Sequence, residues 1–269
     1  MSYWREKVAL VTGGSAGFGR ALAQKLAEAG AAVVLADRDG ERLAEAVEQL
    51  RAGGHEAAGW TADVTQPDQV SSLVDQAVGQ YGRLDVLANI VGRSARGRVL
   101  ETGPEAFREL FELNFLTMVH CTRAAAPHLV RARGHLVNMG SLAAKSASRF
   151  LSAYPVSKFA VAAYSQQLRY ELGPQGVHVL LVCPGPMARA DAGRRYDDQA
   201  VDLPAEARRP GAGVKVRGIL PEKLAARVLK HCERRKPELV LPAKARLLFA
   251  IAQLWPSLAD RILLHMTSG

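Results

Sequence analysis

The sequence reads VALVTGGSAGFG over residues 8–19, an apolar strand followed by a turn rich in glycine. Glycine lets the backbone turn sharply and approach an anion closely, because it adopts positive φ and carries no side chain. A helix that begins at such a turn directs unpaired N–H groups and the positive end of its dipole at the same point. The stretch therefore predicts a binding site for the pyrophosphate of a dinucleotide, contacted by Gly13, Ser15, Gly17, Phe18 and Gly19.

Beyond this turn, short apolar runs alternate with helical patterns, which is the signature of a parallel sheet with crossover helices. Strands are predicted at residues 8–12, 33–37, 57–61, 86–89, 135–138 and 177–183, with a weaker one at 239–241. Helices are predicted at residues 19–29, 41–52, 67–80, 104–131, 154–172 and 221–233. We therefore expect an α/β fold, a single doubly wound domain with about seven parallel strands flanked by helices.

Length and composition fit one ordinary globular domain. The chain has 269 residues, of which 48% are hydrophobic and 23% charged, enough to bury one substantial core. We expect this domain to span residues 1–241. Residues 185–218 are rich in Arg, Ala, Gly and Pro and too long for an ordinary connection, so they are expected to form a lid over the substrate.

Residues 242–269 are expected to form an amphipathic helical extension. Leu247, Leu248, Ile251, Leu254 and Trp255 recur at helical spacing, and the apolar runs are far too short to span a bilayer. Packing on the chain's own domain or on another subunit is favoured. Contact with a membrane surface is the alternative, since basic residues flank the stripe.

The charge and cysteine pattern excludes several classes of protein. The net charge is +9, but the basic residues are scattered and accompany no nucleic-acid-binding motif, so nucleic acid is not expected as a partner. The three cysteines lack a C-x-x-C arrangement, so no metal is expected and a reducing compartment is favoured. The N-terminus carries no apolar signal region, which favours the cytoplasm.

The end of the second strand bears on the choice of coenzyme. Asp37 stands where a carboxylate would accept hydrogen bonds from the adenosine ribose and would repel a 2′-phosphate. Arg38 follows it, and its guanidinium could instead neutralise that phosphate. The sign of the nearer charge favours NAD(H) over NADP(H).

Four further residues are candidates for catalysis. Tyr154 and Lys158 are four residues apart, hence on one face of a helix, and a nearby cation is expected to bring the phenol's pKa closer to neutrality. The hydroxyl of Ser141, after the fifth strand, could hydrogen-bond a substrate oxygen that gains negative charge. Asn114 falls inside a predicted helix, and a buried side-chain amide there is expected to have a structural or functional role.

Taken together, these motifs resemble the short-chain dehydrogenase/reductase family in its 250-residue form. The resemblance spans about residues 6 to 240 and implies a Rossmann-type domain. It includes the glycine turn, Asp63 and Val64 after the third strand, Asn89 and Gly92 after the fourth, the four catalytic candidates, and Pro184 and Gly185 after the sixth.

The resemblance implies a role for each residue. Tyr154 would exchange a proton with the substrate oxygen, Lys158 would bind the nicotinamide ribose and lower the tyrosine pKa, Ser141 would orient the substrate, and Asn114 would hold a water in a proton relay. Asp63 and Val64 would contact adenine. Asn89, Gly92 and the backbone after Pro184 and Gly185 would line the cofactor.

Two positions depart from the family's pattern. Its usual Asn-Asn-Ala-Gly reads Asn89-Ile90-Val91-Gly92 here, so bulkier apolar residues lie at the cofactor floor. The Thr that commonly follows Pro-Gly is replaced by the run Pro186-Met187-Ala188 and Arg189. That change puts the contact with the nicotinamide carboxamide in doubt.

The predicted activity is hydride transfer between a nicotinamide and a secondary alcohol or ketone. Leu142, Ala143, Phe150 and Leu151 follow Ser141 and favour a lipophilic substrate such as an acyl chain, a sterol-like molecule or a small carbonyl compound. Arginines at 189, 194, 195, 208 and 209 could instead meet an anion. The family resemblance implies a homodimer or homotetramer built partly from residues 104–131 and 154–172.

Two other functions stay open. The first is a catalytically idle NAD(P)-binding sensor or scaffold, which has little reason to keep Ser141, Tyr154 and Lys158 together. The second is a sugar-nucleotide epimerase or dehydratase, which uses a similar Tyr and Lys but for which this chain is short.

Overall fold

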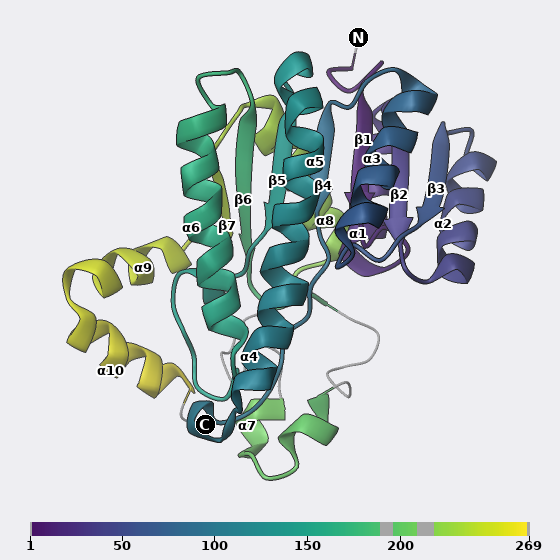
Figure 1. The fold of residues 1–269 in the computed structure, drawn as a ribbon. Helices are drawn as coiled ribbons and strands as arrows, with labels where there is room; N and C mark the ends of the chain where they lie inside the picture. The colour runs from purple at the N-terminus through teal and green to yellow at the C-terminus, as the bar shows by residue number, and fades with distance from the viewer. Residues whose placement is uncertain (1, 189–195, 209–217, 268–269) are drawn as a thin grey trace.

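The structure is a computed structural model that describes residues 2–188, 196–208 and 218–267. Seven strands form one parallel sheet in the order β3-β2-β1-β4-β5-β6-β7 (Figure 1). Their bounds are β1 Val8–Thr12, β2 Ala32–Asp37, β3 Ala57–Thr61, β4 Val86–Asn89, β5 His135–Met139, β6 His178–Pro184 and β7 Glu238–Leu241. The predicted α/β class and sheet are confirmed, with strand bounds that differ from the predicted ones by at most one residue.

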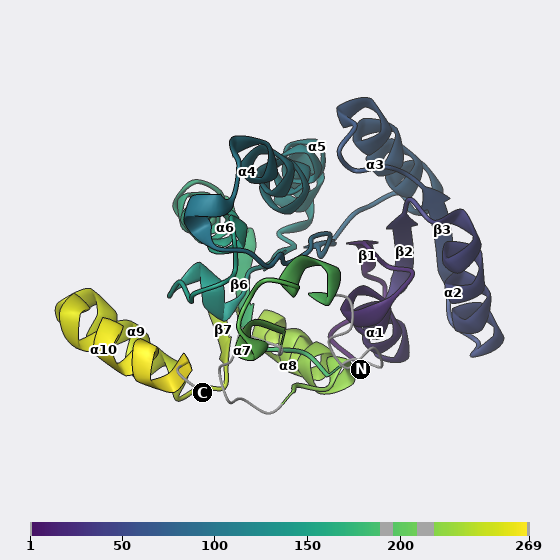
Figure 2. The ribbon, with the colours of Figure 1, turned by 90° about the horizontal axis from the view of Figure 1, so that it is seen from below.

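Helices cover both faces of the sheet (Figure 2). The helices are α1 Gly17–Glu28, α2 Gly40–Ala52, α3 Pro67–Tyr81, α4 Pro104–Phe111, α5 Thr117–Ala132, α6 Tyr154–Leu172, α7 Ala205–Arg208, α8 Pro221–Glu233, α9 Ala245–Leu254 and α10 Pro256–Thr267. One buried apolar cluster joins the sheet to α1, α2 and α8, and another joins it to α3 and α5. The strands are apolar without alternation because both of their faces are buried.

The helix predicted over residues 104–131 is interrupted. A π-helical turn, Glu112–Leu116, lies between α4 and α5. This turn is wider than an α-helical one, and Asn114 lies at its middle. Such single π-turns are frequent at functional sites, because they shift the side chains that follow. Here the turn directs Asn114 inward, where its side chain is fully buried.

The C-terminal extension forms two helices rather than one. The first helix, α9, ends before Trp255, and the second, α10, begins at Pro256. The two helices pack against each other as a pair that projects from the body of the molecule (Figure 1). No side chain of α9 is buried, and Leu247, Leu254 and Trp255 are 69%, 66% and 60% exposed. The expected packing on the chain's own domain is therefore partial. Among the described residues, no helix is both long enough and apolar enough to cross a bilayer.

Candidate active site

The predicted site residues follow the carboxyl ends of the parallel strands and so gather along one edge of the sheet. The glycine turn follows β1, Asp37 ends β2, Asn89 ends β4, Ser141 follows β5, and Pro184 ends β6. The β1 strand pairs with β2 on one side and β4 on the other, so the chain changes direction there. In doubly wound sheets this point forms a crevice that binds ligands.

The glycine turn has the backbone geometry that the sequence predicts. Gly13 and Gly17 have φ of +66° and +53°, a region where residues with a Cβ are strained. A Cβ on Gly19 would lie 2.0 Å from the carbonyl oxygen of Gly13, so no other residue fits there. The α1 helix begins at Gly17 without a side-chain cap on its N–H groups and without an acidic residue in its first turn. Its free N–H groups and its dipole therefore suit an anion.

Phe18 contributes differently from its neighbours. Its side chain is 4% exposed and packs in the apolar cluster beneath α1. Because the side chain points into the core, the predicted contact of Phe18 with a cofactor would come from its backbone in the first turn of α1.

Asp37 is tied to the glycine turn. Its Oδ2 accepts hydrogen bonds from the Ser15 hydroxyl at 2.6 Å and from the Ser15 backbone N–H at 3.3 Å. The carboxylate is therefore held beside the pyrophosphate turn, where the sequence places the ribose. Arg38, the residue after it, is exposed.

Asp63 is engaged with Thr65 at the end of β3. Its Oδ1 accepts from the Thr65 N–H at 3.0 Å and from the Thr65 hydroxyl at 2.8 Å. These bonds, with a smaller contribution from the charge of Arg38, lower the pKa of the Asp63 carboxyl. Val64 is buried. The Asp63 side chain remains partly exposed.

Asn89 lies in a line of buried polar side chains across β1, β4 and β5. Its Nδ2 donates to Asn138 Oδ1 at 3.0 Å and to Thr122 Oγ1 at 3.2 Å. Thr12 Oγ1 donates to the carbonyl of Ala88 at 3.2 Å, which fixes the glycine turn against β4. The Asn89 Oδ1 is buried and has no hydrogen-bond partner among the described residues. Buried acceptors without a partner are rare, so this oxygen calls for a donor from a ligand or a water.

Gly92, Asn114 and Lys158 converge. A Cβ on Gly92 would lie 2.7 Å from Asn114 Oδ1 and 3.4 Å from Lys158 Nζ. Asn114 Oδ1 accepts from the Arg93 N–H at 2.8 Å, and its Nδ2 donates to the Arg93 carbonyl at 2.9 Å and to Ser157 Oγ at 3.0 Å. Ser157 was not among the predicted site residues, although it lies between Tyr154 and Lys158 in the same motif.

Tyr154, Ser141 and Lys158 come together at the end of β5 and the start of α6. Tyr154 begins α6, and its phenol lies close enough to the Ser141 side chain for that side chain to lower the phenol's pKa. Lys158 is 3% exposed, lies 6.0 Å from the Tyr154 ring centroid, and donates to the Met139 carbonyl at 2.8 Å. The three side chains that the sequence predicts to act together are therefore neighbours.

The expected lowering of the Tyr154 pKa does not occur in this structure. Burial raises the pKa of the phenol to about 12, although the nearby Ser141 side chain partly opposes this. Burial also lowers the pKa of Lys158 to about 8. Four-residue spacing indicates which charges are close, but it does not indicate how far both groups are removed from water, and here desolvation dominates.

Two further residues close to Tyr154 were not predicted. Arg96 is 7% exposed, donates from Nε to the Ala207 carbonyl at 2.7 Å, and has its guanidinium 3.8 Å from the ring centroid of Tyr196. Both residues are near enough to influence the Tyr154 pKa, with Tyr196 raising it and Arg96 lowering it. The only sequence signal was the cluster of arginines from Arg93 to Arg98.

Part of the predicted lid packs against the segment that follows β4. Gln199 accepts from the Arg96 N–H at 2.9 Å, and Ala200 and Ala207 are fully buried. Residues 186–188 pair with Ile219. The arginines predicted at positions 189, 194, 195 and 209 lie outside the described residues. Arg208 is exposed, and its guanidinium faces the carbonyls of Ala200 and Val201.

The apolar residues after Ser141 lie beside Tyr154. Ala143 and Leu151 are buried, and Tyr154 packs against them. Phe150, with φ of +61°, and Ser152, with φ of +51°, are in the left-handed region, which is strained for residues that carry a Cβ. A cavity of about 330 Å³ lies between residues 96–106 and residues 198–203, with Ser152 at its wall, but Ser141, Tyr154 and Lys158 do not line it. It is thus adjacent to the catalytic candidates rather than centred on them.

Pro184 and Gly185 lie where the sequence predicts, at the end of β6. The Gly185 N–H donates to the Leu241 carbonyl at 2.7 Å, which fixes the start of the lid to β7. The backbone that follows, up to Ala188, remains partly exposed.

A dinucleotide fits this edge on three observations. The turn excludes a side chain at Gly19, a Cβ on Gly92 would press against Asn114 and Lys158, and Asn89 Oδ1 is buried without a partner among the described residues. These features supply an anion site at α1 and bare backbone at Gly92 beside Lys158.

Comparison with known proteins agrees with this site. The profile of the short chain dehydrogenase family matches residues 7–200. The chain belongs to the short-chain dehydrogenase/reductase family. It is accordingly an oxidoreductase that acts on alcohol and carbonyl groups and binds NAD(P).

Individual relatives cover most of the chain. The putative ketoacyl reductase 1 of granaticin polyketide synthase from Streptomyces violaceoruber is 37% identical over 67% of this chain and 69% of its own. Dehydrogenase/reductase SDR family member 7B of Danio rerio is 30% identical over 96% and 85%. A solved short-chain dehydrogenase/reductase from Burkholderia phymatum, in complex with NAD, has a TM-score of 0.79 at 28% identity and covers 94% of this chain and 96% of that one.

Proposed function

We propose that this short-chain dehydrogenase/reductase is an NAD(H)-dependent enzyme that interconverts a lipophilic secondary alcohol and its ketone, with Tyr154 as the acid/base. The observation that carries the proposal is the proximity of the Tyr154 phenol to both Ser141 and the buried ammonium of Lys158. A cofactor-binding scaffold without chemistry has no need of this arrangement.

The residues divide the work as follows. In the direction of reduction, a nicotinamide cofactor held at this edge of the sheet would supply the hydride for the carbonyl carbon. The Ser141 hydroxyl orients the carbonyl oxygen, and Tyr154 donates its proton to that oxygen as the alcohol forms. A phenol whose pKa is raised to about 12 is protonated at neutral pH, so it is ready to act as the acid. Lys158, whose ammonium lies 6.0 Å from the centre of the Tyr154 ring, would return a proton to the phenolate, and Asn114 would hold a water in that relay.

The apolar lining supports a lipophilic substrate. Ala143 and Leu151 are buried next to Tyr154, so the side chains that pack against the phenol are apolar. Among the relatives, one is named as a ketoacyl reductase and another, from Staphylococcus epidermidis, as a diacetyl reductase that forms (S)-acetoin. Both act on ketones. We propose the same reaction class here, and a homodimer or homotetramer as the assembly.

A substrate panel tests the activity. Purified protein is mixed with NADH and, in turn, with small diketones, β-ketoacyl thioesters and cyclic ketones, and NADH consumption is followed at 340 nm. We expect turnover with at least one apolar ketone. Replacement of Ser141 with Ala should lower kcat for that substrate about 100-fold, because one hydrogen bond to the developing oxyanion is lost. An inert panel with both NADH and NADPH would support the scaffold instead.

Coenzyme choice is a separate prediction that depends on Asp37. Wild-type protein should bind NADH more tightly than NADPH in a fluorescence titration, because the carboxylate held by Ser15 would repel a 2′-phosphate. Asp37→Ser should reduce that preference at least tenfold. Asp75→Ser, on the exposed face of α3, is the control that removes the same charge elsewhere and should leave the ratio unchanged. Tighter binding of NADPH by the wild type would contradict our interpretation of Asp37.

A further inference from the structure

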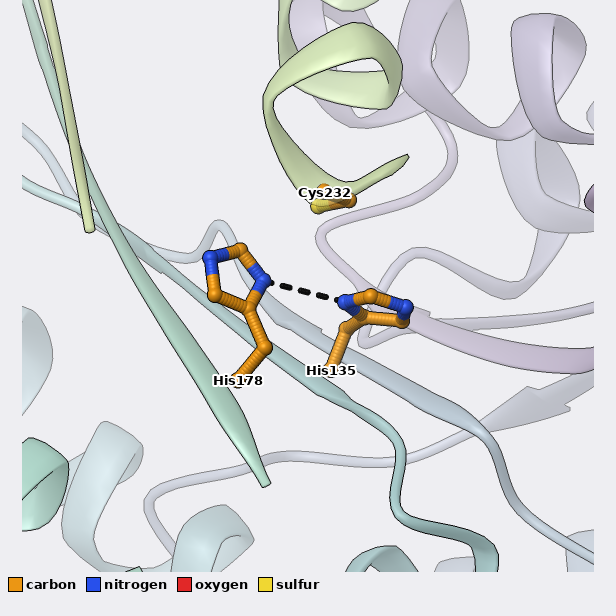
Figure 3. Close-up of side chains that lie close together, drawn as sticks. All are labelled: His135, His178 and Cys232. Carbon is orange, nitrogen blue, oxygen red and sulfur yellow. Dashed lines mark hydrogen bonds between the residues drawn. The ribbon is translucent and has the colours of Figure 1, made fainter. Parts of the chain in front are cut away.

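A second cluster of reactive side chains lies at the opposite edge of the sheet. His135 begins β5, His178 begins β6, and Cys232 lies near the end of α8. All three are buried, and one potential ligand atom from each lies within 4.8 Å of the others. Figure 3 shows the two imidazoles facing each other and Cys232 above the hydrogen bond that joins them.

The hydrogen bonds determine where the imidazole protons are. His178 Nε2 lies 2.8 Å from the Lys236 carbonyl, which can only accept, so Nε2 carries the proton. Both rings are buried, which favours the neutral imidazole with one proton. His178 Nδ1 therefore has a lone pair and accepts from His135 Nδ1 at 3.0 Å. His135 Nε2 in turn accepts from the Tyr3 hydroxyl at 2.6 Å.

The surroundings already supply what metal-binding histidines require. A histidine that binds a metal through one nitrogen usually donates its other N–H to an oxygen, which fixes the ring. His178 Nε2 already donates to the Lys236 carbonyl, and the Tyr3 oxygen lies beside His135 Nε2. Binding through both Nδ1 atoms would need only a shift of the His135 proton to Nε2 and a rotation of the Tyr3 hydroxyl.

The distances are close to those of a coordination sphere. Two nitrogens bound to one cation at about 2.0–2.1 Å lie about 3.3 Å apart, and a bound sulfur lies about 3.6 Å from each of them. The two Nδ1 atoms are 3.0 Å apart, and Cys232 Sγ lies within 4.8 Å of one ring nitrogen of each histidine. To bind a cation, the two Nδ1 atoms would thus move apart by a few tenths of an ångström, and Cys232 Sγ would move about 1 Å closer to them.

The donor set and the local charge select the cation. Thiolate and imidazole suit Cu(I) and Zn(II), whereas Mg²⁺ and Ca²⁺ require oxygen ligands. The guanidinium of Arg235 is close enough to act on both histidines. A buried net positive charge next to it is costly. Cu(I) with one thiolate is neutral, whereas Zn(II) with one thiolate keeps a charge of +1.

We propose that His135, His178 and Cys232 form a binding site for a thiophilic cation, Cu(I) in preference to Zn(II). The cation forms bonds to both Nδ1 atoms and to Sγ, Cys232 releases its thiol proton to solvent, and no atom changes oxidation state. Because β5 and β6 run from this site to the catalytic edge, the site is separate from the proposed chemistry. Its expected effect is to join the N-terminal segment, the sheet and α8.

A competition titration tests the proposal. Reduced, metal-free protein is titrated under anaerobic conditions into the coloured Cu(I) complex of bicinchoninate, and loss of colour measures transfer. We expect one Cu(I) per chain. Cys232→Ser should weaken transfer at least 100-fold, whereas Cys121→Ser, at another buried thiol in α5, should leave it unchanged. A parallel titration with Zn(II) and a chromophoric zinc chelator should show weaker binding.

Further readouts keep the proposal falsifiable if a variant fails to fold. X-ray absorption of the wild-type protein loaded with one Cu(I) should show one sulfur and two nitrogen neighbours. A sphere with several sulfurs, or with none, would overturn the assignment. So would wild-type protein that removes no Cu(I) from the chelator, or a folded Cys232→Ser variant that binds like the wild type. In those cases the histidines only form a hydrogen-bonded chain between Tyr3 and Lys236, a chain that does not involve Cys232. Tighter Zn(II) than Cu(I) binding would refute the charge argument.

Discussion

Replacement of Tyr154 with Phe is expected to lower kcat about 1000-fold while the affinity for NADH changes by less than a factor of three. The substitution removes one hydroxyl, and with it the proton donor for the substrate oxygen. The ring itself remains packed against Ala143 and Leu151, so the fold should be unaffected. The measurement is single-turnover oxidation of NADH at saturating ketone, together with a fluorescence titration of NADH.

The same helix offers a matched control. Tyr170 lies in α6, is 70% exposed, and loses only a surface hydrogen bond with Gln166 when it is changed to Phe. Tyr170→Phe should retain at least half of the wild-type kcat. If Tyr154→Phe keeps comparable activity, the proton comes from another group, and the proposed acid/base is wrong.

Gly19→Ala is expected to abolish measurable NADH binding and to destabilise the protein. The new Cβ would lie 2.0 Å from the Gly13 carbonyl oxygen, which belongs to rigid backbone of the pyrophosphate turn. Relief of this overlap requires the turn and the first residues of α1 to move apart, at a cost of about 1–3 kcal/mol or more. The displaced turn would no longer present its N–H groups to a phosphate. Urea unfolding and NADH titration measure the two effects.

Gly79→Ala is the corresponding control within another helix. Gly79 lies in α3, and a Cβ there would meet nothing within 4 Å. The same substitution should therefore stabilise the protein by about 0.5–1 kcal/mol, because alanine loses less conformational freedom in a helix than glycine does. Normal NADH affinity in Gly19→Ala would contradict our account of the turn.

The sheet could be predicted from sequence because its strands are buried on both faces. Runs such as 8–12 and 178–184 are apolar without alternation and end at turn residues, so both their position and their length were visible. Parallel strands also bring their carboxyl ends to one edge. The neighbourhood of Asp37, Ser141 and Tyr154 thus follows from the order of elements alone.

Other features depend on tertiary structure and could not be predicted from local sequence patterns. Periodicity predicted one helix over 104–131, but the π-turn at Asn114 adds only part of a turn and leaves the apolar spacing almost intact. The C-terminal stripe likewise continued through Trp255, although Pro256 breaks the helix. Arg96 and Tyr196 are a hundred residues apart in the chain, and no local pattern could pair them.

The pKa of Tyr154 shows a different limit. The spacing from Lys158 correctly placed a cation near the phenol, but the direction of the shift was wrong because both groups are desolvated. Burial is a property of the assembled core, and it outweighs a neighbouring charge when the cation is itself removed from water.

The β5 strand carries His135 at its first residue, and Ser141 follows shortly after its last. Five residues of strand extend about 17 Å, well beyond the range over which substitutions without shared partners influence one another. Changes at the two ends should consequently be additive in free energy. An engineer could redesign one end of this strand for stability while leaving turnover at the other end untouched.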